Sequence, residues 1–449
     1  MAVHLHRSLL LIIVLALTIL AYTVPQAAFG KLVLYYGIAF GAYAWAGLHK
    51  PASFEAHSWL NWMVKLVLVF SLPLASDDFY RFYWDGMCVL EKINPYQFTP
   101  HELQTLYPQD WMVVFTKLNS PNYFSVYPPI LQALFAMCAI VGFKSIYLFS
   151  VSWKMLLFLS DVGTIYFLKK LIPKDKIQMV WWYAWNPIIL FEIIANGHPE
   201  GFIMFFIVTA LYYLFRTRYD LSSVMLSLAA AIKIFPIILL PFLWKYLGFK
   251  KGLRYSLLSV LIFILCLCCI YPYQDHFMQS IRLYISSFEF NGSLFEIWKA
   301  IDYQRFGFDN VRHIGQYLSV LFILWTTYLF IRQKSKQWSS LLPSILLMWM
   351  GYLLLSTTVH PWYILPLLLL GTLSGWLVPF IWSGLIVLSY SWYDPTMSTT
   401  WKYALIGIEY MVLLIFFLVD RNGLIRFNLK DTGAHSSCHD FNPGHRCQV

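Results

Sequence analysis

The stretch Ser8–Phe29 reads SLLLIIVLALTILAYTVPQAAF and contains no charged residue. Apolar runs of about 17–25 residues are long enough to cross the hydrocarbon core of a bilayer. Comparable runs recur along the whole chain, for example at Trp59–Ala75, Leu253–Tyr271 and Tyr403–Val419. We therefore predict an all-α membrane protein that crosses the bilayer many times.

The composition supports this class. Of the 449 residues, 59% are hydrophobic and 12% are charged, whereas about a quarter of the residues of a soluble protein are charged. The net charge of +10 does not indicate a nucleic-acid partner, because Lys and Arg lie in short loops between apolar runs, as the positive-inside rule expects. The seven cysteines show neither metal-ligand spacing nor a regular disulfide framework.

The first apolar run follows a short basic segment with His4, His6 and Arg7. It fits either a signal peptide or an uncleaved first helix. No clear cleavage site with small residues follows, and a second apolar run begins at once. We therefore expect the first helix to be retained.

Placing the basic segments in the cytoplasm gives a map of the crossings. These segments are Lys169–Lys176, Arg216–Asp220, Lys245–Arg254, Arg332–Lys336 and the tail after Asp420. With the N-terminus also inside, three crossings place Asp77–Ser145 on the outer face. The same map places four further segments outside, namely Asn196–Glu200, Pro272–Arg312, Thr358–Trp362 and Trp392–Lys402. The total is about 12–14 crossings.

Two segments are too short for the crossings that this map would otherwise give them. Ile130–Val141 has the length of an interfacial or re-entrant helix, so we keep it on the outer side. Leu221–Trp244 has basic loops at both ends and only 24 residues, which indicates two short half-helices that meet near Lys233 and Pro236. A lysine at such depth is a functional hypothesis by default. The alternative is a lysine that snorkels to the interface.

This map divides the chain into four parts. Residues 1–75 form N-terminal transmembrane helices, and residues 76–145 form a long outer loop with interfacial helices. Residues 146–420 form a transmembrane bundle. Residues 421–449 form a cytoplasmic tail, which we expect to be disordered because its polar end, Lys430–Val449, contains few apolar residues.

The outer loop opens with SDDFYRFYWDG, residues 76–86. Carboxylates and an arginine among so many aromatic residues are unlike an ordinary solvated connector. Asp77 and Asp78 emerge at the membrane boundary, where partial desolvation can raise the pKa of one of them towards that of a general base. The alternative is a helix cap with aromatic residues in the interfacial belt.

The complete run resembles the first outer loop of the GT-C glycosyltransferases. It is most similar to the bacterial polyprenyl-phosphate-mannose-dependent mannosyltransferases, which share the pattern Asp-Asp-x-Tyr-Arg-Tyr-x-Trp-Asp-Gly, then Asn-Pro-Tyr and Tyr-Pro-Pro. The last two motifs stand here at residues 94–96 and 127–129. Weaker similarities lie in Trp153–Leu168 with Asp161, Asn196–Glu200, Ala231–Pro236 and Val359–Tyr363. The two helices ahead of the one that leads to Asp77 depart from the family's usual pattern.

The resemblance implies a GT-C-like bundle and an enzyme that transfers a hexose, with mannose favoured, from a polyprenyl-phosphate donor. The acceptor is a glycan or a lipid-linked sugar, and the reaction inverts the anomeric carbon at the outer face. Asp77 is the expected base, because it precedes Trp84 by seven residues, as the catalytic aspartate does in the glucosyltransferase relatives. Asp78 is the alternative.

The expected substrate-binding residues are Arg81, Trp84, Asp85, Asn94, Tyr96, Tyr127, His198, Glu200, Lys233, Arg282, His360 and Trp362. Arg81, Lys233 and Arg282 are candidates for the donor phosphate, or else interfacial anchors. Asp85 either binds sugar hydroxyls or orders the loop. His198 and Glu200 are candidates for contacts with acceptor or sugar, and Trp362 beside His360 would offer a stacking face.

The resemblance also bears on cofactors, location and the competing class. Asp-Asp is similar to the metal-binding Asp-x-Asp of nucleotide-sugar enzymes, but a monophosphate donor lacks a diphosphate, so we predict no obligate metal. We expect the inner membrane of a bacterium, membrane lipids as partners and a role in cell-envelope glycans. A transporter or flippase of a lipid-linked sugar also fits intramembrane charges such as Asp161 and Lys233. The carboxylates clustered in one outer loop favour the enzyme.

Overall fold

The computed structural model describes residues 2–49, 58–106, 112–308 and 311–421. Within these ranges the regular structure is helical and no strand forms; one isolated bridge joins Phe290 and Thr358. The predicted all-α class is therefore confirmed. The predicted cytoplasmic tail lies almost wholly outside the described residues.

Five helices of the described chain are long and apolar enough to cross a membrane. They are α1 (Ala2–Thr23), α8 (Ile146–Leu171), α13 (Phe249–Leu267), α16 (Val311–Arg332) and α20 (Thr399–Arg421). A sixth span is added if η3 (Ile189–Ala195) and α10 (Glu200–Phe215), which meet at a bend of 112°, are counted as one. The protein is therefore a polytopic membrane protein, and 12–14 crossings remain a prediction that requires shorter helices to cross as well.

The remaining helices are not among the five candidate spans. In chain order they are α2 (Phe29–Leu48), α3 (Ser58–Val69), α4 (Asp78–Leu90), α5 (Pro100–Leu106), α6 (Met112–Phe115), α7 (Pro129–Val141), η2 (Lys174–Lys176), α9 (Met179–Ala184), α11 (Tyr219–Ile232), η4 (Phe235–Leu239), α12 (Leu240–Leu247), η5 (Cys268–Ile270), α14 (Gln274–Ser287), α15 (Ser293–Phe306), α17 (Trp338–Leu354), η6 (Pro361–Ile364), α18 (Leu365–Ser374), α19 (Val378–Leu385) and η7 (Ile386–Tyr393).

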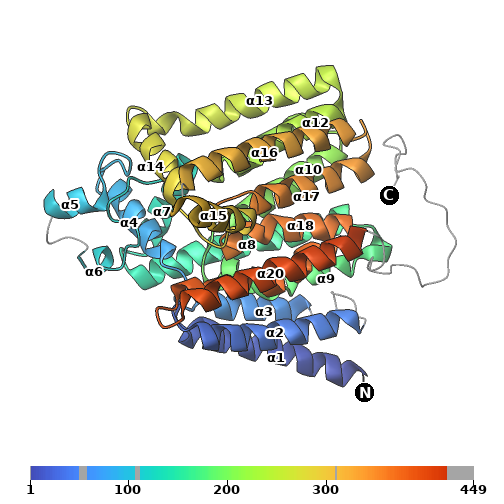
Figure 1. The fold of residues 1–449 in the computed structure, drawn as a ribbon, viewed down its shortest axis with the longest axis horizontal. Coiled ribbons are helices and arrows are strands. Elements are labelled where there is room, and N and C mark those ends of the chain that lie inside the picture. Colours follow the sequence, from blue (N-terminus) through green and yellow to red (C-terminus); the bar gives the residue numbers. More distant parts are fainter. Residues whose placement is uncertain (1, 50–57, 107–111, 309–310, 422–449) are drawn as a thin grey trace.

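The helices α4 to α7 gather at one end of the bundle, away from the beginning of α1 (Figure 1). Several basic loops lie together elsewhere in the bundle. The Lys245 ammonium group donates to the carbonyl oxygen of Ile331 at 2.9 Å, and Arg254 pairs with Asp220 at 2.8 Å. This grouping agrees with the predicted map, although the side of the membrane on which each end lies remains a prediction.

The two segments that were too short for their crossings, Ile130–Val141 and Leu221–Trp244, form short helices in the structure. α7 has 13 residues and packs against α4. α11 ends at Ile232, Lys233 is extended, and the chain resumes as η4 and α12. Pro236, near the start of η4, lacks the N–H that a continuous helix would need there. The break at Lys233 is thus present in the structure.

Buried charges fix the helices that lead to the Asp77 loop. Lys65 on α3 pairs with Asp161 on α8 at 2.5 Å, and both side chains are fully buried. Lys154 on α8 donates to carbonyl oxygens on both sides, to Leu68 at 2.9 Å and to Ala195 at 3.2 Å. A buried cation needs such partners, and these bonds tie the end of α3 to the end of η3.

Candidate active site

Asp77 stands at the N-cap position of α4, as the alternative interpretation of the acid pair expects, but its side chain makes no capping hydrogen bond. Asp78 is partly buried, and one of its carboxylate oxygens accepts from the side-chain amide of Asn119 at 3.0 Å. The Asp77 side chain is exposed and accepts no hydrogen bond from the described residues. Of the two carboxylates, Asp77 is therefore the more exposed and the one whose side chain accepts no hydrogen bond from the described residues.

The surroundings of Asp77 favour its protonated form more than water does. Partial burial raises the pKa of the Asp77 carboxyl, and the negative charge of Asp78 raises it further, while Lys117 lowers it. Lys117 lies over the ring of Tyr80, with its nitrogen 5.4 Å from the ring centroid. A carboxylate with a raised pKa is a stronger proton acceptor once it is ionised, which is what a general base requires.

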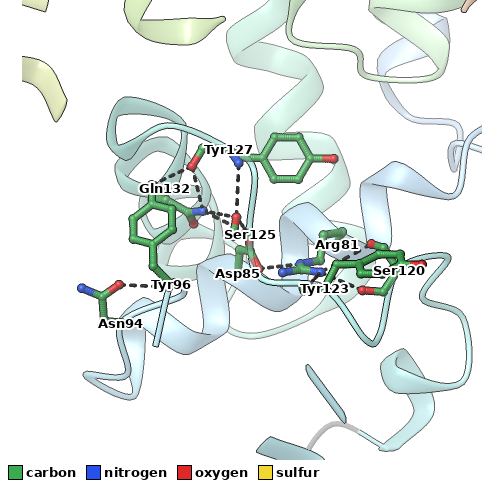
Figure 2. Close-up of polar contacts among 9 residues, drawn as sticks. All are labelled: Arg81, Asp85, Asn94, Tyr96, Ser120, Tyr123, Ser125, Tyr127 and Gln132. Carbon is green, nitrogen blue, oxygen red and sulfur yellow. Dashed lines mark hydrogen bonds and ion pairs between the residues drawn. The ribbon is translucent and has the colours of Figure 1, made fainter. Parts of the chain in front are cut away.

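Arg81 is buried within the outer loop and is bonded to it (Figure 2). Its Nε donates to Asp85 at 2.8 Å, and its Nη1 donates to the carbonyl oxygens of Ser120 and Tyr123, both at 3.0 Å. These bonds hold the segment around residue 120 against α4. The structure thus gives Arg81 a role in loop order, and its contact with a phosphate remains a prediction.

Asp85 is also buried, at 1% exposure, and its second oxygen has partners of its own. That oxygen accepts from the Ser125 hydroxyl at 2.5 Å and from the Gln132 amide at 3.0 Å (Figure 2). This geometry matches the loop-ordering role that was one of the two interpretations of Asp85. Trp84 is equally buried and packs near Phe115, with the ring centroids 6.1 Å apart.

The Asn-Pro-Tyr and Tyr-Pro-Pro motifs hold each other (Figure 2). The Asn94 side chain accepts from the backbone N–H of Tyr96 at 3.0 Å, and the Tyr96 hydroxyl donates to the carbonyl oxygen of Tyr127 at 2.6 Å. The ring of Tyr127 meets the ring of Phe82 edge-on, 5.0 Å away. In the structure, Asn94, Tyr96 and Tyr127 therefore fix the path of the outer loop.

A second group of predicted residues comes together from three distant segments. Trp362 stacks on His198 with the ring centroids 3.7 Å apart and on His360 with the centroids 4.6 Å apart. His360 also stacks on Phe290, with the centroids 4.4 Å apart. The bridge between Phe290 and Thr358 holds the two loops in register.

Glu200 and Lys233 complete this group, which we call the stacked-ring cluster: His198, Glu200, Lys233, His360 and Trp362. The Lys233 ammonium group lies 2.9 Å from a Glu200 oxygen and 3.6 Å from the centroid of the Tyr363 ring. The Glu200 side chain is 3% exposed and that of Lys233 is 37% exposed. The buried Glu200 carboxylate thus fixes the Lys233 ammonium group, while part of the Lys233 side chain remains exposed to solvent.

Polar atoms of the stacked-ring cluster are buried without hydrogen-bond partners among the described residues. They are the second Glu200 oxygen, both ring nitrogens of His198 and Nδ1 of His360. Burial, together with the charges of Lys233 and His198, lowers the pKa of His360 to about 3. The His360 ring is therefore neutral near pH 7 and offers one donor and one acceptor. Such unpaired buried atoms suit a polar ligand or water.

Sequence reasoning missed Glu192, which supports His198. Glu192 on η3 is fully buried; one oxygen accepts from the Tyr390 hydroxyl at 2.8 Å, and the other lies 3.3 Å from Nε2 of His198. The Tyr390 hydroxyl also lies 3.5 Å from the carbonyl oxygen of Ala75, two residues before Asp77. A signal was present, since a single carboxylate inside the apolar run ILFEIIA is a functional hypothesis by default.

Trp153 joins the Asp77 loop to the stacked-ring cluster. Its indole N–H donates to the carbonyl oxygen of Gly197 at 2.6 Å, and its ring lies 5.7 Å from that of Phe82 on α4. Burial raises the pKa of Tyr127, and the charges of Asp78 and Glu200 both add to the effect. The charges of both the Asp77 loop and the stacked-ring cluster therefore act on Tyr127.

Arg282 is exposed on α14, a helix whose His276 lies 3.0 Å from the carbonyl oxygen of Tyr96. In the part of the chain that the structure describes, no hydrogen bond or ion pair joins Arg282 to the other predicted site residues. Nor do the described His, Cys, Asp and Glu side chains form a group of three or more that could hold a metal ion. The roles of Arg282 and of a metal therefore remain predictions.

Comparison with known proteins adds a family match. A family model described as alpha-(1->6)-mannopyranosyltransferase, N-terminal domain, matches residues 5–247, more than half of the 449 residues. No curated protein matches the chain. The match begins within α1, so the N-terminal helices that depart from the wider GT-C pattern lie inside it. It includes Asp77 and Glu200, whereas His360 and Trp362 come from the half that follows.

Proposed function

The chain belongs to the family of alpha-(1->6)-mannopyranosyltransferases and is a mannosyltransferase. From that premise we propose that it transfers mannose from a polyprenyl-phosphate donor to a glycan or lipid-linked acceptor. The reaction takes place at the extracytoplasmic face of a bacterial inner membrane. The observation that carries the proposal is an exposed Asp77 with a raised pKa, on a helix that Trp153 links to the segment of the stacked-ring cluster.

Asp77 acts as the general base. An acceptor hydroxyl attacks the anomeric carbon of mannose, the bond from that carbon to the phosphate oxygen breaks, and the polyprenyl phosphate leaves with the electron pair. The Asp77 carboxylate takes the hydroxyl proton. The raised pKa supports this role because a base works best when its pKa lies near the working pH.

Lys233 stabilises the leaving phosphate. Its ammonium group is fixed by Glu200 at 2.9 Å while the side chain stays 37% exposed, so a phosphate at the membrane boundary can approach it. The His360 N–H adds a neutral donor, consistent with a pKa of about 3. Fixed donors aimed at a developing negative charge are among the largest contributions to catalysis.

Glu200 and the stacked rings bind the sugar. The Glu200 oxygen without a partner among the described residues accepts a mannose hydroxyl. Trp362, held between interactions with His198 and His360, gives the apolar wall of the subsite. Glu192 keeps His198 in place by the contact of 3.3 Å.

The family's linkage sets the stereochemistry of the donor. Displacement by a single attack inverts the anomeric carbon, so an alpha-(1->6) product requires a donor in which mannose is β-linked to the phosphate. No observation favours the transporter alternative, because Asp161 is fully buried and paired with Lys65.

The donor class is tested by transfer in membranes that contain the full chain. Labelled β-linked polyprenyl-phosphate mannose, its α-linked anomer, β-linked polyprenyl-phosphate glucose and a nucleotide-diphosphate mannose are supplied in turn with a mannan-type acceptor. We expect label to pass from the β-linked mannosyl lipid only. Transfer from the nucleotide sugar, or none from any lipid-phosphate sugar, would contradict the proposal.

A further inference from the structure

A cavity of about 410 Å³ opens where α11 and α13 begin. Its lining residues are Thr217, Arg218, Tyr219, Asp220, Leu221, Lys251, Arg254 and Tyr255. α11 runs from this cavity to Lys233, and its 14 residues span roughly 20 Å at about 1.5 Å per residue. The cavity is therefore separate from the candidate active site.

The lining is strongly cationic. Arg218, Lys251 and Arg254 face one carboxylate, that of Asp220, which pairs with Arg254 at 2.8 Å. Lys251 lies over the ring of Tyr219, with its nitrogen 5.2 Å from the centroid. No second carboxylate lines the cavity, so the charges of Arg218 and Lys251 are not neutralised by its walls. The cavity suits an anion.

The two helices add to this positive potential. α11 and α13 both start at the cavity, and neither has a side-chain hydrogen bond at its N-cap. The first backbone N–H groups of a helix carry partial positive charge and favour a phosphate. The helix N-termini and the basic side chains thus both make the potential in the cavity more positive.

The cavity lies at the start of a helix that is long and apolar enough to span a membrane, which is where lipid headgroups are expected. α13 is one of the helices able to span the membrane, and Lys251 and Arg254 belong to its first turns. α13 runs along one edge of the bundle (Figure 1). Around the helix from the basic residues, α13 exposes an apolar side formed by Leu253, Leu257, Leu261 and Ile264. A ligand with a phosphate and two acyl chains matches a cationic cavity beside an exposed apolar surface.

We propose that this cavity binds the phosphate of an anionic membrane phospholipid. The headgroup occupies the space between Arg218 and Lys251, and the acyl chains follow α13. Inorganic phosphate shares the headgroup chemistry but not the acyl chains, so the two sources can be separated. The proposal depends neither on Asp77 nor on the identity of the sugar donor.

The test uses the purified full chain in detergent. Native mass spectrometry and thermal unfolding are measured with phosphatidylglycerol, phosphatidylethanolamine or inorganic phosphate. We expect only phosphatidylglycerol to remain bound and to raise the unfolding temperature. The double variant Arg218→Gln, Lys251→Gln leaves the Arg254–Asp220 pair intact, and it should bind about thirtyfold more weakly, from about 1 kcal/mol per basic residue.

The matched control is Lys174→Gln, Lys176→Gln, which removes two exposed charges from another basic loop and should bind as wild type does. Each single variant, Arg218→Gln or Lys251→Gln, should bind about fivefold more weakly; these variants answer the question if the double variant does not fold. Equal losses in the control would overturn the proposal by pointing to diffuse charge attraction. Equal effects of phosphatidylethanolamine or of inorganic phosphate would overturn it as well.

Discussion

Asp77 differs from the other carboxylates at the start of its loop in what surrounds it. Asp78 accepts a hydrogen bond from Asn119, and both oxygens of Asp85 are bonded within the loop. Asp77 is exposed and accepts none from the described residues, and its pKa is raised by burial and by Asp78. An aspartate kept out of the local hydrogen-bond network at the mouth of a polar region is available to take a proton from a substrate.

The positive charge of Lys117 affects the pKa of Asp77. It lowers the pKa of Asp77, so Lys117→Gln should raise that pKa further. Because only ionised Asp77 acts as a base, the acidic limb of the transfer rate should move to higher pH. The measurement is the pH dependence of mannose transfer by wild type and variant.

The exposed Lys92 provides the control, since Lys92→Gln should leave the acidic limb in place. An acidic limb that stays fixed in Lys117→Gln, or moves to lower pH, would show that Asp77 does not govern it.

At the level of elements, hydrogen bonds to residues 120–132 fix the position of α4. Arg81 and Asp85 on α4 are buried and bind residues 120–132. A buried ion pair that loses one partner costs about 3–5 kcal/mol, because the other charge is left uncompensated. The Asp77 loop therefore depends on this pair for its shape.

Asp85→Asn should accordingly destabilise the fold by several kcal/mol and lower the unfolding temperature of the purified protein. The exposed pair Lys144–Glu91, with a distance of 2.6 Å between its charged groups, is the comparison. Glu91→Gln should change stability by no more than about 1 kcal/mol. A variant Asp85→Asn that unfolds at the wild-type temperature would show that Asp85 does not order the loop and would reopen its role as a sugar ligand.

Some features of these elements could be predicted from the sequence alone. The length of the apolar runs predicted the helical class, and the 24 residues of Leu221–Trp244 predicted a break that the structure has at Lys233. Chain length and proline positions are local properties, so both can be read without a fold. The family pattern likewise pointed to Asp77, Glu200 and Lys233 as residues of one site.

Other features depend on contacts between distant segments. The sequence did not reveal that Arg81 is bonded to loop carbonyls, because the partners lie 39 and 42 positions away. Nor did it reveal the stack of His198, Trp362 and His360, which only the packing of three loops creates. Glu192 was missed because its hydrogen-bond partner Tyr390 lies 198 positions further along the chain.

At the scale of the whole molecule, the candidate site belongs to both halves of the chain. The family match covers residues 5–247, yet His360 and Trp362 stack on His198 from the half that follows. The stacked-ring cluster therefore needs the full chain to form. The proposed function also requires that this end of the bundle face outwards, where we expect the acceptor.

A labelling experiment tests that orientation. In a background with serine in place of the native cysteines, a cysteine at Lys174 should resist a membrane-impermeant maleimide added outside. A cysteine at the exposed Asn122 should react. Labelling of the Lys174 position from outside in intact cells would reverse the predicted map.

The central claim is that Asp77 is the base of a mannosyl transfer. The most direct measurement compares transfer from labelled polyprenyl-phosphate mannose by wild type, Asp77→Asn, Asp78→Asn and the exposed control Glu91→Gln. We predict that Asp77→Asn loses about 10²–10⁴-fold in rate, that Asp78→Asn loses less and that Glu91→Gln keeps wild-type transfer. Full transfer by Asp77→Asn would contradict the account.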